Sequence, residues 1–261
     1  MSKCIVKGES LIALANTIRD KSGTSEQLVF PDGFIDGIND IKANSSGVDN
    51  LAAALELGEA FTDYTNDQVL TVVMDAFYCF PHIRTVNLPS CQSVQQQAFH
   101  WCESMTDINL PSCTSIGTMA FGTCTSLVNV NIPNCQKIGD IAFSGCSSLT
   151  YIDCPEVITV SYTGFSGCKS LTTINLPKCI TIEKQAFKNC SKLSEIYLNS
   201  STMCTLENVN AFENTPYSGN TEEFSGTPYI YVPSNMIDAY KADTNWSQFS
   251  EYFKAIEIDN N

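Results

Sequence analysis

The chain has few basic residues and no long apolar run. Its 261 residues contain 14 Lys and Arg against 28 Asp and Glu, which gives a formal net charge of −14. Binding to nucleic acid phosphates needs clustered Lys and Arg, so we expect no nucleic acid partner. We expect no membrane insertion either, because no stretch of about 18 consecutive apolar residues occurs.

The N-terminal sequence lacks the features of a secretory signal peptide. Its apolar residues are interrupted by Lys7, Glu9 and Asn16, and no small-residue cleavage site follows. The sequence therefore predicts a chain that begins in a cytoplasm and reaches the outside by another route, such as virion assembly and lysis.

Catalytic motifs are missing as well. The sequence contains no G-x-S-x-G, Walker loop, H-E-x-x-H or glycine-rich dinucleotide turn. Asp153 and Glu156 have no second acid opposite them, so we interpret them as a surface pair rather than a glycosidase pair. His82 and His100 stand at loop positions, where packing or surface roles are commoner than catalysis. We therefore expect no enzymatic activity, no cofactor and no metal site.

The acidic charge lies mainly outside the middle of the chain. Residues 69–205 contain eight Asp and Glu and seven Lys and Arg, so this part carries −1 and the flanks carry −13. The middle therefore cannot attract a ligand by net charge alone.

A 22-residue repeat fills this middle part. Its most visible mark is an Ala-Phe or Gly-Phe pair at Ala76-Phe77, Ala98-Phe99, Ala120-Phe121, Ala142-Phe143, Gly164-Phe165 and Ala186-Phe187. A seventh pair, Ala211-Phe212, follows after 25 residues. Further columns keep the step of 22: Ile83, Met105, Leu127, Leu149, Leu171 and Leu193; Val86, Ile108, Val130, Ile152, Ile174 and Ile196; Leu88, Leu110, Ile132, Cys154, Leu176 and Leu198; Val94, Ile116, Ile138, Val160, Ile182 and Cys204. A fixed period of this length is typical of a solenoid, whose stacked coils bury a continuous core.

Each repeat predicts a short strand followed by a turn. Val130 and Ile132 alternate with the polar Asn129 and Asn131, which is strand spacing. In five units a proline follows directly, and it ends the strand because it cannot donate a ladder hydrogen bond. The residues that we predict to be buried include Phe121, Phe143, Leu127 and Ile132.

Nine of the 13 cysteines also form columns at the repeat step. The columns are Cys102, Cys124, Cys146, Cys168 and Cys190, and Cys91, Cys113, Cys135 and Cys179, with Val157 in a cysteine position. Zinc is disfavoured because no C-x-x-C pair occurs. A disulfide ladder is disfavoured because stacked Cβ atoms lie about 5 Å apart, beyond the ~3.8 Å that disulfides prefer. We predict reduced thiols that act as small buried hydrophobic groups.

The ends of the chain do not repeat. We predict an N-terminal helical attachment module at residues 1–42, a linker at residues 43–50, the solenoid with its N-terminal cap at residues 51–214 and a C-terminal cap at residues 215–261. Residues 61–64 and 69–73 are expected to form short capping strands. The C-terminal cap is expected to contain a strand at residues 229–233 and a helix capped by Ser234, with Trp246 and Tyr252-Phe253 covering the last coil.

The repeat unit, A-F-x-x-C-x-x-L-x-x-I-x-L-P-x-C-x-x-I, resembles the BspA-like leucine-rich repeats over residues 61–214. Departures are Phe80 at a cysteine position, Val157 at another and Gly164 for alanine. The segment IYVPSNMIDAYKADTNW resembles the closing segment of such arrays. The resemblance implies an α/β leucine-rich-repeat solenoid of 22-residue coils with a parallel sheet on one face, a small N-terminal helical module and a C-terminal α/β cap.

Residues 7–41 resemble a module that precedes variable domains in tail-associated proteins of phages and prophages of gut Firmicutes. The motifs G-E-S-L, T-I-R-x-K-S-G-T and F-P-D-G-F carry this resemblance. It implies a virion protein that docks on a phage tail or baseplate component through residues 1–42 and binds a bacterial surface protein or glycan. Two alternatives stay open: the segment only caps the solenoid, or the chain is a BspA-like adhesin at a bacterial cell surface. Whether the chain forms a homo-oligomer is also open.

Two residues of each strand are expected to face outward and to form the binding surface. One column varies in charge and size, as a recognition surface does: Thr85, Asp107, Asn129, Tyr151, Thr173 and Glu195. The other is nearly uniform, which a stacked amide ladder would explain: Asn87, Asn109, Asn131, Asp153, Asn175 and Tyr197. The rings of Tyr151 and Tyr197 suit sugars and protein partners alike. We expect the strands to line a concave, ligand-binding side, with Trp101 and Tyr162 as candidates on the loop edges instead.

Overall fold

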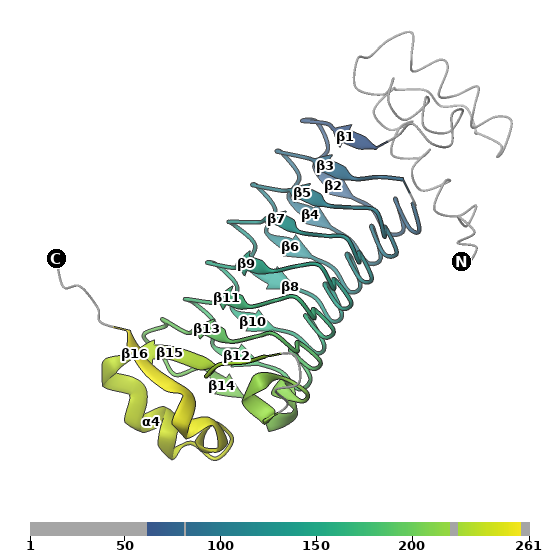
Figure 1. Ribbon diagram of the computed structural model, residues 1–261. Helices are drawn as coiled ribbons and strands as arrows, with labels where there is room; N and C mark the ends of the chain where they lie inside the picture. Colours follow the sequence, from purple (N-terminus) through teal and green to yellow (C-terminus); the bar gives the residue numbers. More distant parts are fainter. Residues whose placement is uncertain (1–61, 81, 220–223, 257–261) are drawn as a thin grey trace, which may run out of the picture.

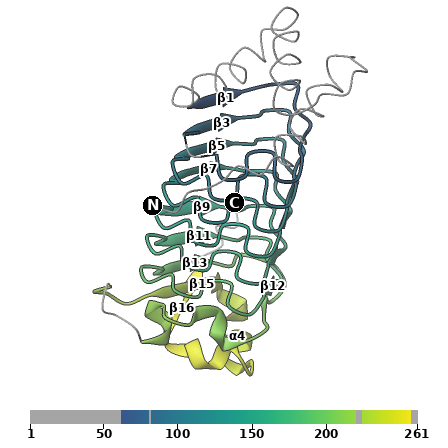
Figure 2. The same ribbon diagram turned by 90° about the vertical axis from the view of Figure 1, so that its right-hand side faces the viewer.

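The computed structural model describes residues 62–80, 82–219 and 224–256. It is an elongated stack of coils with a helical cap at the C-terminal end (Figures 1 and 2). The predicted parts at residues 1–42 and 43–50 lie outside the described residues. Among the described residues, no helix is long and apolar enough to cross a membrane.

Each coil contributes one three-residue strand and one two-residue strand. The longer strands are β1 (Asp63–Thr65), β3 (Thr85–Asn87), β5 (Asp107–Asn109), β7 (Asn129–Asn131), β9 (Tyr151–Asp153), β11 (Thr173–Asn175) and β13 (Glu195–Tyr197). The shorter strands are β2 (Thr71–Val72), β4 (Ser93–Val94), β6 (Ser115–Ile116), β8 (Lys137–Ile138), β10 (Thr159–Val160), β12 (Thr181–Ile182) and β14 (Thr205–Leu206). The fold predicted from the sequence, a leucine-rich-repeat solenoid with parallel strands, is confirmed.

Strands of neighbouring coils pair in parallel at the repeat step, as between Thr85 and Asp107. The short strands form one continuous seven-stranded sheet from β2 to β14. The long strands form two sheets, β1-β3-β5-β7 and β9-β11-β13-β15-β16, so this face is divided between β7 and β9. One face of the solenoid is therefore continuous and the other is interrupted.

The core is organised around a stack of phenylalanine rings. The seven Phe rings of the Ala-Phe and Gly-Phe pairs, from Phe77 to Phe212, stack with centroids 4.9–5.8 Å apart and interplanar angles of 2–10°. The predicted burial is confirmed for Phe121, Phe143, Leu127 and Ile132, none of which is more than 1% exposed. The repeat step thus places identical rings directly above one another.

Each Ala-Phe turn is bracketed by two positions with a positive φ. The first position is occupied by Asp75, Gln97, Met119, Ile141, Thr163 and Gln185. The second is occupied by Cys79, Trp101, Thr123, Gly145, Gly167, Asn189 and Asn214. Only glycine adopts this left-handed region without strain, yet most of these residues have side chains. The repeated turn holds them there, which the sequence pattern did not reveal.

The expected N-terminal capping strands are a regular coil of the array. Tyr64 of β1 pairs with Val86, and Val72 of β2 pairs with Val94, in the same register as later coils. The described part of the array accordingly has seven coils, one more than the six units that the sequence predicted. The first described coil closes the core with a tyrosine where later coils have an aliphatic residue.

One column assignment at the last coil is wrong. Ile182 pairs with Leu206, not with Cys204. Cys204 instead continues a cysteine column, with its Sγ 3.8 Å from the Sγ of Cys179. The extra residues of this coil therefore lie largely before Cys204, in the connection between β13 and β14.

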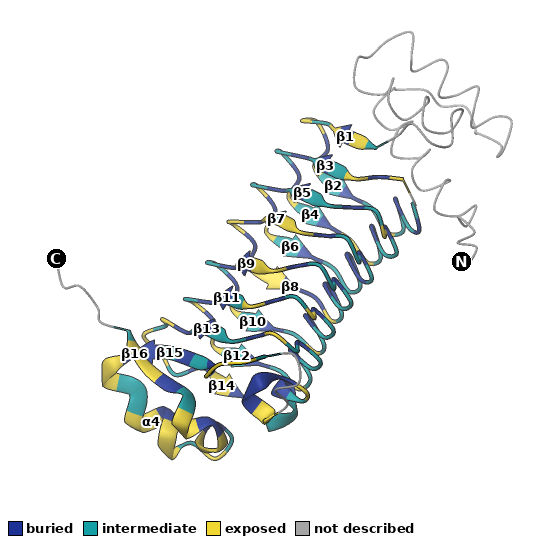
Figure 3. Cartoon of the chain, in the orientation of Figure 1, coloured by how far each residue is buried: buried dark blue, intermediate teal, exposed yellow. Residues whose placement is uncertain are grey.

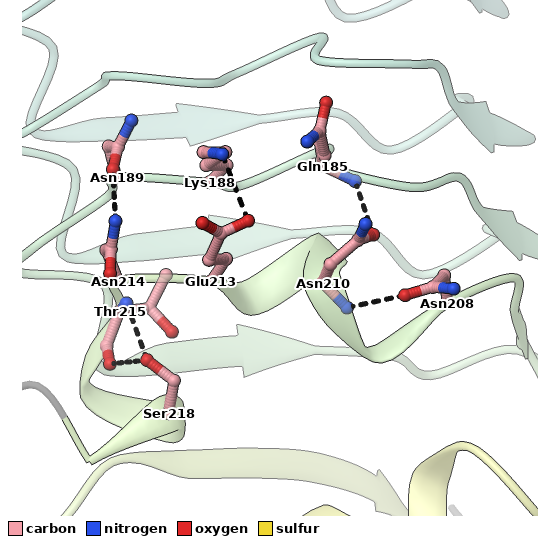
Figure 4. Close-up of polar contacts among 9 residues, drawn as sticks. All are labelled: Gln185, Lys188, Asn189, Asn208, Asn210, Glu213, Asn214, Thr215 and Ser218. Carbon is pink, nitrogen blue, oxygen red and sulfur yellow. Dashed lines mark hydrogen bonds and ion pairs between the residues drawn. The ribbon is translucent and has the colours of Figure 1, made fainter.

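Polar side chains fasten the last coil to the one before it (Figure 4). Asn214 Nδ2 donates to Asn189 Oδ1 at 2.8 Å, and Lys188 pairs with Glu213 at 3.0 Å. This coil contains the short helices η1 (Val209–Phe212) and η2 (Pro216–Ser218), and Ser218 Oγ bonds both the amide and the carbonyl of Thr215. These contacts keep the irregular coil in line with the stack despite its added residues.

The C-terminal cap consists of β15 (Tyr229–Pro233), η3 (Ser234–Met236), α4 (Ile237–Ala242), η4 (Trp246–Tyr252) and β16 (Phe253–Ile256). The predicted strand at residues 229–233 is confirmed. The predicted helix cap is wrong, because Ser234 is the first residue of η3 and makes no capping bond. Trp246 covers the last coil as predicted: it is buried, and its Nε1 donates to Cys204 O at 2.7 Å. Tyr240 OH accepts from Cys204 N at 2.8 Å, so the cap satisfies both backbone groups of one buried residue.

Candidate binding face

The two outward columns predicted from the sequence lie on the face of the long strands. Thr85, Asp107 and Asn129 are in register on β3, β5 and β7. The remaining members of that column, Tyr151, Thr173 and Glu195, are in register on β9, β11 and β13. The face is thus a pair of columns in two runs, one on each side of the division between β7 and β9.

The second column forms the amide ladder that its uniform composition indicated. Asn109 Nδ2 donates to Asn87 Oδ1 at 2.6 Å, and Asn131 Nδ2 donates to Asn109 Oδ1 at 2.5 Å. Beyond the division, Asn175 Nδ2 donates to Asp153 Oδ1 at 2.8 Å. Every donation runs from one coil to the preceding coil. These bonds stabilise the stack and occupy groups that would otherwise bind a ligand.

Side chains of the first column are also linked. Thr85 donates to Asp63, which lowers the pKa of that carboxyl group. Asn129 Nδ2 donates to Asp107 Oδ1 at 2.5 Å, and Thr173 Oγ1 donates to Glu195 Oε2 at 3.3 Å. The variable column is therefore partly engaged within the protein rather than fully free for recognition.

The division between β7 and β9 interrupts the backbone ladder. At β3, β5, β7 and β13 the residue before the strand and its first residue donate to one carbonyl, as Val128 and Asn129 both donate to Thr106 O, whereas at β11 only Thr172 N does so. Among the described residues, Thr150 and Tyr151 make no such bond to Val128 O, and Ile132 N makes none to Asp153 O. Three backbone donors that are engaged in other coils are thus left without a ladder partner here.

The outward residues beside this division are more exposed than those on the neighbouring strands. On β7 and β9 the outward residues are exposed, as they are on β1 at the start of the described array, whereas on β3, β5, β11 and β13 they are half-buried (Figure 3). Tyr151 is 50% exposed, and even the core residue Val130 is only partly buried. We refer to this place, formed by Asn129, Asn131, Thr150, Tyr151 and Asp153, as the seam.

An open depression of about 380 Å³ lies on the face at the N-terminal side of the seam. Its polar lining comes from Thr85, Asn87, Asp107, Asn109, Asn129, Asn131, Thr150 and Tyr151. Four of the predicted site residues, Thr85, Asp107, Asn129 and Tyr151, therefore come together at one place. Thr173, Glu195 and Tyr197 do not line it.

Tyr197 belongs to a separate aromatic cluster at the C-terminal end of the face. Its ring stacks on Tyr231 with centroids 4.4 Å apart, and Lys254 Nζ lies 3.4 Å from the ring centroid of Tyr229. Tyr229 and Tyr231 were not among the predicted site residues, although the alternating Tyr-Ile-Tyr-Val of residues 229–232 indicated outward rings at both positions. Mutual stacking and the lysine cover much of these rings, so the cluster offers less open surface than the seam.

The two loop-edge candidates lie away from the depression. Trp101 is half-buried at a turn position with φ 65°, and its ring contacts His100 edge-on at 5.8 Å. Tyr162 is 37% exposed, and its backbone N donates to Glu183 Oε2 at 2.7 Å. Neither residue lines the depression, so they serve as matched comparisons for the strand face.

The nine column cysteines are buried free thiols. The Sγ atoms of Cys102, Cys124, Cys146, Cys168 and Cys190 donate to phenylalanine carbonyls of the preceding coil at 3.0–3.2 Å. Burial raises the pKa of Cys102 to about 12 and that of Cys124 well above its usual value. The columns therefore act as weak hydrogen-bond donors as well as small apolar groups. Cys179 differs, because its hydrogen bond with Cys204 lowers its pKa.

Neither histidine lines the depression. His82 is exposed, and burial lowers the pKa of His100, which packs in a turn near Tyr78. Within the part of the chain that the structure describes, no three His, Cys, Asp or Glu side chains are placed to hold a metal ion. What the face presents is hydrogen-bonding amides, hydroxyls and carboxylates beside an exposed phenol ring.

Three solved structures show the same fold. A leucine-rich cell surface protein from Faecalibacterium prausnitzii is 24% identical over 66% of this chain and 42% of that chain, with a TM-score of 0.50. A leucine-rich repeat protein from Eubacterium ventriosum is 26% identical over 63% of this chain and 44% of that chain, with a TM-score of 0.55. The leucine-rich repeat protein of T. pallidum is 24% identical over 64% of this chain and 86% of that chain, with a TM-score of 0.51. The chain spans less than half the length of the first two. A comparison with proteins of curated function finds no match.

A family model accounts for most of the described chain. The model of the BspA type leucine-rich repeat region matches residues 70–160 and 114–225, with six copies. These ranges together cover more than half of the 261 residues and coincide with the stacked coils and their phenylalanine column. The chain therefore belongs to the BspA-type leucine-rich repeat family.

Proposed function

We propose that the chain is a non-enzymatic adhesin of a bacterial cell surface, which binds a protein or glycan through the face of its long strands. The observation that carries the proposal is the depression beside the seam, where side chains from four successive coils meet. Family membership supports it, as does the similarity to a structure described as a leucine-rich cell surface protein. Repeat proteins commonly recognise partners through such extended surfaces.

The chemistry of the face fits recognition by contact rather than by long-range attraction. The repeat region is nearly neutral, and the depression is lined by amides, hydroxyls, one carboxylate, the Tyr151 ring and aliphatic residues such as Val128. Tyrosine binds with little loss of side-chain freedom and is common at the centres of binding sites. Tyr151 and Asn129 are therefore the residues whose loss should weaken binding most.

Binding of the fluorescently labelled full chain to intact gut bacteria and to epithelial cells tests the proposal. We expect Tyr151→Ala and Asn129→Ala to reduce binding while changing stability by no more than about 0.5 kcal/mol, because both side chains are exposed. Trp101→Ala and Tyr162→Ala are the matched controls and should bind like the parent. If the controls lose binding and the strand-face variants do not, the binding surface is on the loop edges. If the parent binds none of the cells, the adhesin proposal fails.

Attachment to a phage tail is the second candidate. It depends on the resemblance of residues 7–41 to tail-associated modules, and those residues lie outside the described part of the chain. The experiment is co-expression with candidate tail proteins: a chain lacking residues 1–42 should keep its thermal transition and lose incorporation into particles. Loss of the transition itself would make residues 1–42 a cap for the solenoid.

A further inference from the structure

The amide ladder of the second column ends at the seam because the residue type changes there. In this column Asn109 and Asn131 each donate to the side-chain carbonyl oxygen of the asparagine one coil earlier. The next residue in that column is Asp153, whose carboxylate has no N–H to donate. Asn131 Oδ1 is therefore left as an open acceptor at the end of the ladder.

The first column is linked only in pairs, and none of these pairs crosses the seam. Asn129 Nδ2 donates to Asp107, and Tyr151, 22 residues further on, makes no hydrogen bond to Asn129 among those of the described residues. The amide oxygens of Asn129 and Asn131 accept no hydrogen bond among those of the described residues, and the backbone N–H groups of Thr150 and Tyr151, which line the same depression, lack ladder partners. Donors and acceptors are thus mixed at one exposed place.

An aromatic ring stands next to these polar groups. Tyr151 is 50% exposed and lines the depression together with Asn129, Asn131 and Thr150. Its phenol presents an apolar face within reach of a ligand that hydrogen-bonds to the open amides. The depression, at about 380 Å³, lies at the lower end of the range for small-molecule sites.

From this arrangement we infer that the seam between β7 and β9 is a binding site for an uncharged glycan. The inference rests on the proposed function and names its ligand class. Each sugar hydroxyl is both donor and acceptor, so neighbouring hydroxyls satisfy the open amide oxygens and the free backbone N–H groups together. The C–H face of the ring packs on Tyr151. An acidic glycan is disfavoured, because none of the lining residues is Lys or Arg, and Asp107 lines the depression while Asp153 adjoins it.

The test uses the full chain on a printed array of neutral hexose and N-acetylhexosamine oligosaccharides, with sialylated and uronic acid oligosaccharides alongside. We expect binding to neutral oligosaccharides, followed by titration calorimetry with the neutral oligosaccharide bound best. Tyr151→Ala should weaken that binding by about tenfold, whereas Tyr151→Phe, which keeps the ring, should stay within about threefold of the parent. Tyr162→Ala, which removes an exposed ring elsewhere, should bind like the parent.

Asp153→Asn is the sharpest variant because it changes a single group. The new amide can donate to Asn131 Oδ1 and extend the ladder, as Asn131 does to Asn109. We expect it to leave the thermal transition unchanged or raised while weakening glycan binding by about threefold or more. Binding equal to that of the parent would show that Asn131 Oδ1 does not serve the ligand and would overturn the geometry proposed here.

Three results would overturn the inference: no neutral oligosaccharide bound, a preference for acidic ones, or unchanged binding by Tyr151→Ala. Periodate oxidation destroys glycans on the cells. Cell binding measured before and after it therefore shows whether only the glycan inference fails or the proposed adhesin function fails as well. Binding that depends on Tyr151 but survives oxidation would mean a protein partner, which leaves the adhesin proposal intact and overturns the glycan.

Discussion

The stacked phenylalanine column should control the stability of the whole array, and Phe143 is the place to test it. Phe143 is fully buried near the middle of the stack, with ring centroids 5.2 Å from Phe121 and 5.4 Å from Phe165. Removing its ring leaves a cavity between two rings that cannot collapse without shifting the backbones of neighbouring coils. Since each coil is held mainly by its neighbours, the damage lies on both sides of the substitution.

The expected magnitude follows from burial and stacking. Phe143→Ala should lower the free energy of unfolding by about 3–5 kcal/mol, the usual cost of truncating a buried phenylalanine. Phe143→Leu keeps most of the apolar volume and loses two ring pairs worth about 0.5–1.5 kcal/mol each, so it should cost about 1–3 kcal/mol. We therefore predict that the free energy of unfolding decreases from the parent to Phe143→Leu and again to Phe143→Ala, and we predict the size of both decreases.

Urea unfolding measured by circular dichroism and by tryptophan fluorescence gives both quantities. The two tryptophans of the sequence report different ends, Trp101 in an early coil and Trp246 in the C-terminal cap. If the array unfolds as one unit, both probes should shift to lower urea together. Tyr162→Ala is the surface control and should change stability by less than about 0.5 kcal/mol. A loss below about 1 kcal/mol for Phe143→Ala would refute the argument that this column carries the core.

Other predictions concern the turns, the thiols and the cap. Gly145 has φ 78°, so Gly145→Val should cost about 1–2 kcal/mol in urea unfolding, while Thr123→Gly, at φ 60° in the same column, should not destabilise; equal effects would contradict the strain argument. Because burial raises the pKa of thiols such as Cys124, a thiol reagent at pH 8 should label few of the 11 described free cysteines before unfolding and all of them afterwards; extensive oxidation or bound zinc would count against this. Tyr240→Phe leaves the buried Cys204 N–H without its acceptor and should cost about 1–3 kcal/mol in thermal or urea melts; a neutral effect would mean that another group takes over.

Much of the fold was predictable because the same pattern of buried and exposed residues recurs in every coil. The period of 22 placed Phe121 and Phe143 in one column, and alternation separated the buried Ile132 from the exposed Asn131. The asparagine column likewise predicted an amide ladder, which the structure contains. The irregular last coil was aligned wrongly, because the sequence does not show whether its added residues precede or follow Cys204.

The candidate site was predictable only in part. The sequence placed Thr85, Asp107, Asn129 and Tyr151 on one face, and the structure brings these four to one depression. It grouped Glu195 and Tyr197 with them, but these lie in the second run of strands, near the tyrosines of the cap. Residues that recur every 22 positions do not show between which two coils the backbone hydrogen bonds are interrupted.

Local sequence was sufficient for the coil because its burial pattern, turn residues and period act over a few residues and recur. The seam was decided by tertiary structure, since it depends on how two whole coils meet: β8 and β10 stay paired on one face while β7 and β9 do not pair on the other. Its only marks in the sequence are single exchanges, Asp153 in an asparagine column and Cys154 in a leucine column. Such exchanges are tolerated elsewhere in the array, and only the packing of neighbouring coils turns these two into an opening with unpaired donors and acceptors.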